Sequence, residues 1–178
     1  TEGTRNTGLG SNTAIALTTG DDNTAVGYNA LAATTTANDN TGIGAFALAA
    51  NTTGYRNVAV GSYAGDAITT GIENTYVGYV AGSSHTTGNY NVGIGKGALY
   101  ANTTGYRNTA VGTNTLEANT EGHSNTGLGQ GALNDNTTGN ENCAIGRAAL
   151  AKNTTGGENT AIGYKALEAN TTGSENVG

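Results

Sequence analysis

One motif recurs along the whole chain at a fixed spacing of seventeen residues. It consists of Asn, then usually Thr or Val, a small residue, an aliphatic residue and Gly, and no copy deviates from the spacing. The copies begin at Asn6, Asn23, Asn40, Asn57, Asn74, Asn91, Asn108, Asn125, Asn142, Asn159 and Asn176. Such self-similarity indicates a repeat architecture, in which each unit has one conformation and packs on the next.

The full unit reads N-[TV]-[AG]-[VIL]-G-x-x-A-L-x-x-N-T-T-G-x-x, and ten complete units run from Asn6 to Glu175. We number the positions of the unit 1 to 17 from this Asn, and we call the residues that share a position a column. The chain begins and ends inside a unit and has no initiator Met. We therefore expect residues 1–178 to form a single repeat domain that is a segment of a longer fibrous protein.

The composition excludes an ordinary globular core. The chain has 30 Gly, one Phe, no Pro, Trp or Met, and only 35% hydrophobic residues. A disordered chain would not keep an aliphatic residue and a Gly in fixed register over ten units. The net charge of −6 is spread along the chain, so no basic face for nucleic acid is expected. No apolar run approaches transmembrane length, so no membrane-inserting segment is expected.

The unit is rich in Thr, Val, Ile and Asn, has two fixed Gly positions, and lacks helical apolar spacing. This pattern predicts two short strands joined by two turns, so that one unit makes one coil. The predicted fold is all-β, a parallel β-solenoid (β-roll) of ten 17-residue coils. In such a stack the Asn column at position 1 forms an amide ladder, and Gly at position 5 occupies a turn with positive φ or a close backbone approach.

Each coil offers only two sizeable aliphatic side chains, for example Val111 and Leu116. Two are too few to offset the ordering entropy of seventeen residues, which predicts lateral association with further copies. The small residues at position 3 are predicted to let another backbone approach closely. Tyr76 interrupts this column, and the pattern offers no account of it beyond a local gap or bulge.

The motif "NTAVG", followed by "AL", resembles the head repeats of trimeric autotransporter adhesins. The stretch "NTAIGYKALEANTTG" at Asn159 to Gly173 is similar to repeats of phage tail-fibre and related surface proteins, and the resemblance covers the whole chain. It implies a left-handed, homotrimeric β-roll that is extracellular, on a cell surface or on a virion. The implied function is that of a structural, non-enzymatic rod that spaces or presents a tip for a host-surface receptor or glycan.

Motifs that suggest chemistry are weak. Cys143 is the only cysteine and stands in a Thr column, with neither His85 nor His123 in its unit or the next, so a small buried thiol is expected. The "GIGKG" of Gly93 to Gly97 suggests a phosphate loop, but the same columns hold "AVGSY" and "AIGRA" elsewhere, and no helix start follows. We therefore expect no catalytic residue, no cofactor and no bound metal.

Charged side chains concentrate at position 17. Asp39, Arg56 and Glu73 could form ion pairs between coils, whereas Glu141, Glu158 and Glu175 stack like charges. One carboxylate per coil makes a poor calcium cage, so a solvated edge is the simpler interpretation. Glycosylation sequons occur at Asn51, Asn102, Asn136, Asn153 and Asn170, and we interpret them as a column of the repeat.

The paired Thr columns at positions 13 and 14, from Thr18 and Thr19 to Thr171 and Thr172, leave an alternative function open. Ranks of Thr on a solenoid could bind ice or another surface. Exposed Tyr residues could serve recognition, but they do not share one column, which favours solubilising scatter. The Tyr residues in variable positions are Tyr28, Tyr55, Tyr63, Tyr79, Tyr90, Tyr100, Tyr106 and Tyr164.

Overall fold

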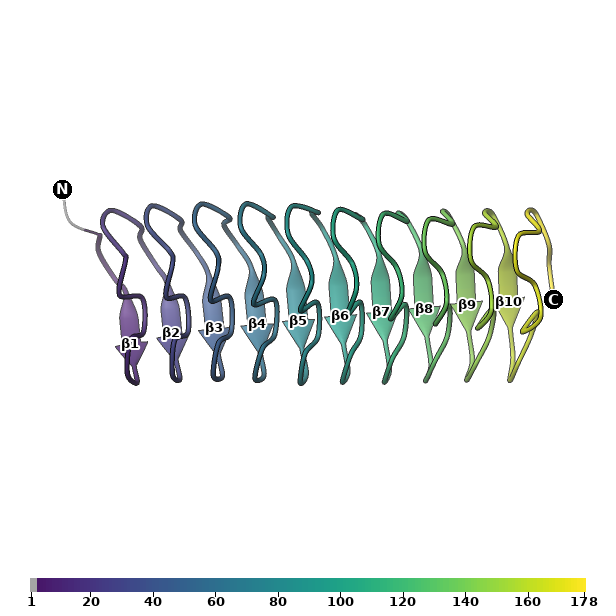
Figure 1. Cartoon of the computed structure of the whole chain (residues 1–178), viewed down its shortest axis with the longest axis horizontal. Helices are drawn as coiled ribbons and strands as arrows, with labels where there is room; N and C mark the ends of the chain where they lie inside the picture. Colours follow the sequence, from purple (N-terminus) through teal and green to yellow (C-terminus); the bar gives the residue numbers. More distant parts are fainter. Residues whose placement is uncertain (1–2) are drawn as a thin grey trace.

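The computed structural model describes residues 3–178 and is an elongated parallel β-solenoid (Figure 1). Ten strands form one sheet in the order of the chain, each parallel to the next and displaced by seventeen residues. They are β1 (Thr7–Leu9), β2 (Thr24–Val26), β3 (Thr41–Ile43), β4 (Val58–Val60), β5 (Thr75–Val77), β6 (Val92–Ile94), β7 (Thr109–Val111), β8 (Thr126–Leu128), β9 (Cys143–Ile145) and β10 (Thr160–Ile162). The all-β solenoid with its seventeen-residue register is thereby confirmed.

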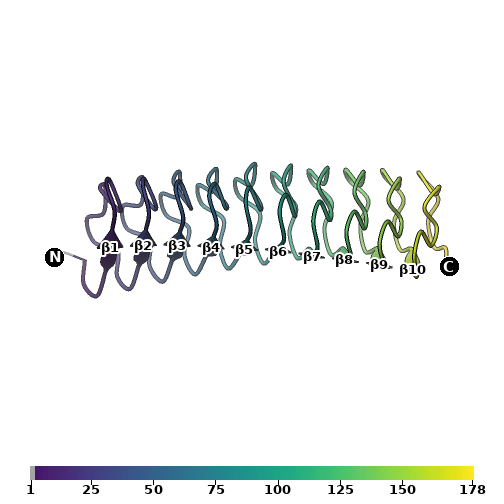
Figure 2. The ribbon, with the colours of Figure 1, turned by 90° about the horizontal axis from the view of Figure 1, so that it is seen from below.

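Each coil contains one strand, at positions 2 to 4, rather than the two that the composition predicted. The rest of the coil consists of turns and bends that return the chain to the next strand (Figure 2). The second predicted strand would lie around the Thr pair at positions 13 and 14. It is not a regular strand, because two successive backbone amides often donate to the same carbonyl: Thr52 and Thr53 both donate to Thr69 O, at 3.0 and 3.3 Å. Between residues 3 and 178 there is no helix long and apolar enough to cross a membrane.

The Asn column at position 1 forms the predicted ladder. From Asn6 to Asn159, the Oδ1 of each Asn accepts the backbone N–H of the Asn one coil later, at 2.9–3.1 Å. The Nδ2 of each Asn also donates across its own coil to the carbonyl at position 15, at 2.7–3.1 Å. The side chain thus closes its own coil and joins it to the next one, with its polar atoms satisfied in the interior.

A second Asn ladder at position 12 was not predicted. The Nδ2 of Asn119 donates to Asn102 Oδ1 at 2.8 Å, and the same bond repeats from Asn136, Asn153 and Asn170 to the Asn one coil before. Each of these amides also donates to the Gly carbonyl three residues later. The sequence does contain the signal, because Asn recurs at this position within "NTTG", but it reads equally well as a polar turn.

The core lies inside the coils and is built from the small residues at positions 3 and 8 together with Leu at position 9. Leu31, Leu48, Leu99, Leu116, Leu133 and Leu150 are fully buried, as are Ala25, Ala59, Ala110, Ala144 and Ala161 at position 3. The prediction that position 3 faces another copy of the chain is therefore wrong. Small side chains stand there because the strand must pass close to the Leu column in the narrow interior.

The Gly at position 5 meets both predicted requirements. Its φ lies between 123° and 138° in all ten coils. A Cβ added at Gly61 would lie 2.5 Å from the carbonyl oxygen of Gly78 in the next coil. Only Gly has access to this conformation at this separation, so the column sets both the corner after the strand and the stacking of coils.

Three further positions per coil have left-handed backbone, and most of their residues are not Gly. Positions 7, 9 and 17 have φ values from 45° to 66° in every coil from Asn6 to Glu175, Gly residues included. Asn tolerates this region well, and a β-branched residue tolerates it badly. Val80, with φ of 51°, is the β-branched residue at position 7, where Asn114 has φ of 55°.

We expect Val80→Asn to stabilise the protein by about 1 kcal/mol, because it relieves left-handed strain at a site where other coils already carry Asn. Asn114→Val should destabilise by a similar amount. For a chain of this size the two changes correspond to shifts in Tm of roughly 2–4 °C in opposite directions, measured by circular dichroism. Shifts of the same sign would contradict a backbone origin of the effect.

Candidate functional site

The side chains that point away from the core on the sheet form one continuous strip, which we call the outer face. It consists of positions 2 and 4 in β1 to β10, because in β2 to β10 the middle residue of each strand is buried and the residues on either side of it are not. In β1, at the end of the rod, all three residues are exposed. Its members are Thr7, Leu9, Thr24, Val26, Thr41, Ile43, Val58, Val60, Thr75, Val77, Val92, Ile94, Thr109, Val111, Thr126, Leu128, Cys143, Ile145, Thr160 and Ile162. The strip follows the row of strands along the rod in Figure 1.

The outer face carries no charge and is rich in exposed methyl groups. Every residue in it is Thr, Val, Ile, Leu or Cys. Inside the rod Leu128 is 46% exposed, and at the two end coils Leu9 and Ile162 are 68% and 62% exposed. A contiguous strip of exposed methyl groups is the kind of surface that favours contact with a partner.

The structure therefore places the two aliphatic columns on opposite faces of the sheet, with position 9 in the core and position 4 on the outer face. Leu116 is buried in the coil, whereas Val111 is half-buried on the outer face. Cys143 also lies on the outer face and is half-exposed, so the prediction of a buried thiol is wrong. Period-two alternation could separate these residues but could not say which side of the strand faces the core.

The Thr hydroxyls of the outer face differ from those of the predicted Thr ranks. At position 13, each Oγ1 from Thr18 to Thr154 donates to a Thr carbonyl one coil later, at 3.0–3.3 Å. Position 14 is exposed in every coil. At position 2, within the described part of the chain, no Thr hydroxyl has a hydrogen-bond partner in the protein. Hydroxyls free for an external ligand therefore lie on the outer face as well as at position 14.

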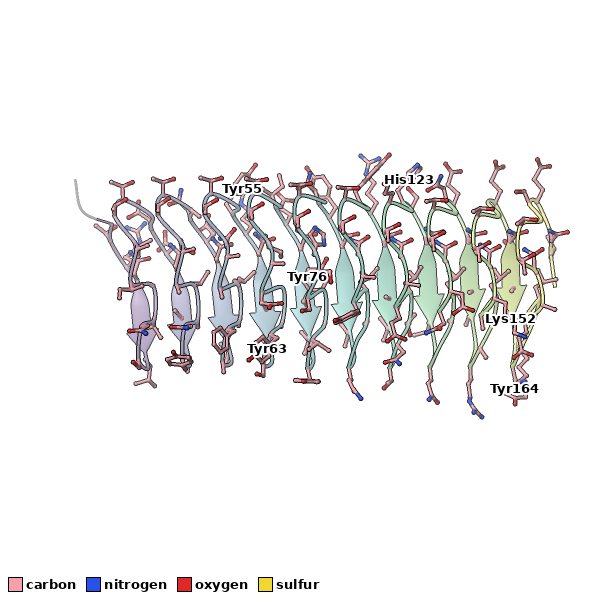
Figure 3. The ribbon with its side chains drawn as sticks, viewed as in Figure 1. Tyr55, Tyr63, Tyr76, His123, Lys152 and Tyr164 are labelled. Atoms are coloured by element: carbon pink, nitrogen blue, oxygen red, sulfur yellow. The ribbon has the colours of Figure 1, made fainter. Side chains whose placement is uncertain are left out.

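Aromatic side chains gather along two edges of the rod (Figure 3). On one edge Phe46 stacks on Tyr63, with ring centroids 4.9 Å apart, and meets the edge of Tyr28 at 5.3 Å. On the other, Tyr106 stacks on His123 at 4.7 Å. These rings cover one another along the rod axis, so they support the stacking of coils more directly than they present ring faces to a ligand.

The charged column at position 17 behaves as predicted for the paired members. Arg56 lies 3.9 Å from Asp39 and 3.1 Å from Glu73, and Arg5 pairs with Asp22 at 2.6 Å. These side chains are largely exposed, so each pair contributes little to stability. Within residues 3–178, no three His, Cys, Asp or Glu side chains gather closely enough to hold a metal ion.

The "GIGKG" amides are occupied by the repeat. Gly95 N donates to Val77 O at 2.8 Å, and Gly97 N donates to Tyr79 O at 3.1 Å, as equivalent residues do in other coils. A phosphate would have to displace these bonds, so the motif cannot form an anion cradle in this fold.

The sequon residues Asn51, Asn102, Asn136 and Asn153 are fully buried, which places their amides out of reach of a modifying enzyme in the folded protein.

Comparison with protein families, with curated proteins and with solved structures finds no match to this chain.

Proposed function

We propose that this chain is a structural, non-enzymatic fibre segment that associates through its outer face into a homotrimeric rod. The proposal depends on one observation: twenty uncharged Thr, aliphatic and Cys side chains form a strip along the full length of the sheet. Covering this strip with two further copies removes apolar area from water at every coil. Because the strip repeats with the coil, identical rods can pack in register along their whole length.

The resemblance to adhesin-head and tail-fibre repeats supports the same assembly and suggests where it acts. As an extracellular, cell-surface or virion-borne rod, the segment would hold a receptor- or glycan-binding tip at a fixed distance. The fold suits that role, because the Asn ladder at position 1 and the sheet bind each coil to its neighbours throughout the length of the rod. A left-handed coil, as in the adhesin heads, is part of this proposal.

We expect light scattering on the purified protein to give three times the 17.6 kDa mass of the chain. The assembly should persist in high salt, because an uncharged apolar contact is not screened. A stable monomer across the micromolar range would overturn the homotrimer, and a dimer would retain the contact surface but not the threefold arrangement.

A second candidate function is binding of ice or another ordered surface. The observation that favours it is the set of unpaired Thr hydroxyls on the outer face, in line with aliphatic methyl groups at the spacing of hydrogen-bonded strands. The two candidates require different states of the same face, because a covered face cannot meet ice. Thermal hysteresis from a monomeric protein would support ice binding, and its absence together with a trimeric mass would exclude it.

A further inference from the structure

Four residues that differ from the consensus of the repeat lie together in the middle of the rod. Tyr76 replaces the small residue at position 3, and it is fully buried. In its own coil and the one before, position 9 is Gly82 and Gly65 rather than Leu. A Cβ added at Gly82 would lie 2.5 Å from Tyr76 Cε1, and one added at Gly65 would lie 3.3 Å from Cδ2. The Tyr ring therefore fills the volume that two missing Leu side chains leave.

The fourth of these residues is His85, which stands at position 12 of the same coil and is also fully buried. Its Nδ1 contacts the Tyr76 hydroxyl, and Asn102 Nδ2 lies 3.1 Å from the same nitrogen. Its Nε2 lies 2.7 Å from the carbonyl oxygen of Gly88. Since a carbonyl only accepts, Nε2 carries the proton, and the single lone pair of Nδ1 is shared by two donors, the Tyr76 hydroxyl and the Asn102 amide. The arrangement requires a neutral imidazole.

In the part of the chain that the structure describes, no carboxylate lies close enough to His85 to stabilise its protonated form. The side chains before and after it at position 12 are Ile68 and Asn102. Burial is the main cause that lowers the pKa of His85 to about 4, and burial also raises the pKa of Tyr76. The half-buried Asp66, one coil earlier, bonds to Ser83, and burial raises the pKa of this carboxyl. Its protonation in acid therefore acts in the opposite direction and does not destabilise the coil.

We propose that the Tyr76–His85 pair is an acid-sensitive seam in the rod: a proton taken up from solvent at His85 Nδ1 opens the coil of residues 74–90 locally, while coils beyond its neighbours stay folded. The added proton points at two groups that already donate to Nδ1. The Tyr76 hydroxyl can rotate and accept a hydrogen bond from the protonated Nδ1, but the amide nitrogen of Asn102 can only donate. The position-12 ladder is thus interrupted where it begins.

The direction of the pH effect follows from the lowered pKa. The neutral form is favoured in the folded coil, so its stability is full above the ordinary histidine pKa of about 6.5 and falls as the pH drops toward about 4. Each coil contacts only its neighbours, so the loss acts locally first. The seam lies inside a coil, away from the outer face, and therefore does not depend on the proposed assembly.

Two measurements on the whole chain test the seam. We expect the imidazole NMR signal of His85 to stay in its neutral form at about pH 5.5, with His123 as the internal reference. Amide exchange, corrected for its intrinsic pH dependence, should show opening within residues 74–102 that rises on the order of 50–100-fold between about pH 7.5 and about pH 4.5.

The matched variant is His85→Asn, because Asn occupies this position in the following coils and its amide can donate to Gly88 O as Asn102 does to Gly105 O. It should fold and lose the acid response, while His123→Asn should keep it. If His85→Asn is poorly folded, His85→Gln offers a second non-titrating side chain. Equal acid opening in a folded non-titrating variant, or opening that starts at the ends of the rod, would overturn the proposal.

Discussion

Deleting residues 108–124 should leave a folded rod that is shorter by one coil, about 4.8 Å. The deletion joins Arg107 to Asn125, and every column continues across the junction: Asn91 then bonds to Asn125, and Asn102 then bonds to Asn136, as successive ladder members do elsewhere. Because solenoid stability depends mainly on nearest neighbours, we expect Tm to change by only a few degrees.

Deleting one residue fewer, 108–123, should split the rod. Ser124 then enters the Asn column at position 1, and each following residue takes the next higher position of the unit where the two parts meet. Gly129 leaves the column that needs positive φ, and Leu128 takes its place. A one-residue slip also turns the outer face of β8 inward. We expect two melting transitions or a single one lowered by more than 10 °C, and equal Tm values for the two deletions would mean that the seventeen-residue spacing does not set the register.

The repeat made the coil-to-coil contacts predictable. Once Asn recurs every seventeen residues in a stack of strands, its side chain must meet the Asn of the next coil, and Oδ1 of Asn91 indeed accepts from the backbone of Asn108. The same reasoning predicted the Gly column and the pairing of Arg56 with Asp39 and Glu73. Contacts between identical positions depend only on the period, which the sequence shows without ambiguity.

The contents of a single coil were harder to predict. Positions 2 and 4 must share one face and position 3 the other, but the alternation is the same whichever side is inside. The volume of the core decides: Leu116 at position 9 fills the interior, and only a small residue such as Ala110 fits opposite it. The number of strands was wrong for a related reason, because the Thr pair satisfies its backbone through shared carbonyls and side-chain hydroxyls rather than through a regular ladder.

The Tyr76–His85 pair shows what a departure from the repeat can reveal. Taken alone, Tyr76 had no explanation. Taken with Gly65 and Gly82, it becomes an exchange of volume, because large and small residues swap between positions 3 and 9 in adjacent coils. His85 then replaces the ladder residue that meets the new hydroxyl. The departures lie in neighbouring coils, so a search for compensating exchanges between columns could have found this cluster from the sequence.

Val111→Asp should abolish assembly without unfolding the coil. Val111 lies on the outer face and is half-buried in the isolated chain, so a carboxylate there remains in contact with water until copies associate. In a homotrimer three carboxylates would enter an apolar contact with no partner, and each would lose its hydration. We expect light scattering to give the 17.6 kDa monomer, with the circular dichroism of the strands retained at low temperature.

Thr113→Asp is the matched control, because it introduces the same charge two residues later at an exposed turn position, away from the outer face. It should leave both the mass and Tm close to those of the parent. Leu116→Asp supplies the opposite reference, since it places the carboxylate inside the coil and should prevent folding altogether. If Val111→Asp unfolds like Leu116→Asp, position 4 serves the core. If it assembles like Thr113→Asp, copies of the chain meet on another surface. Only loss of assembly with a folded monomer identifies the outer face as the contact between rods.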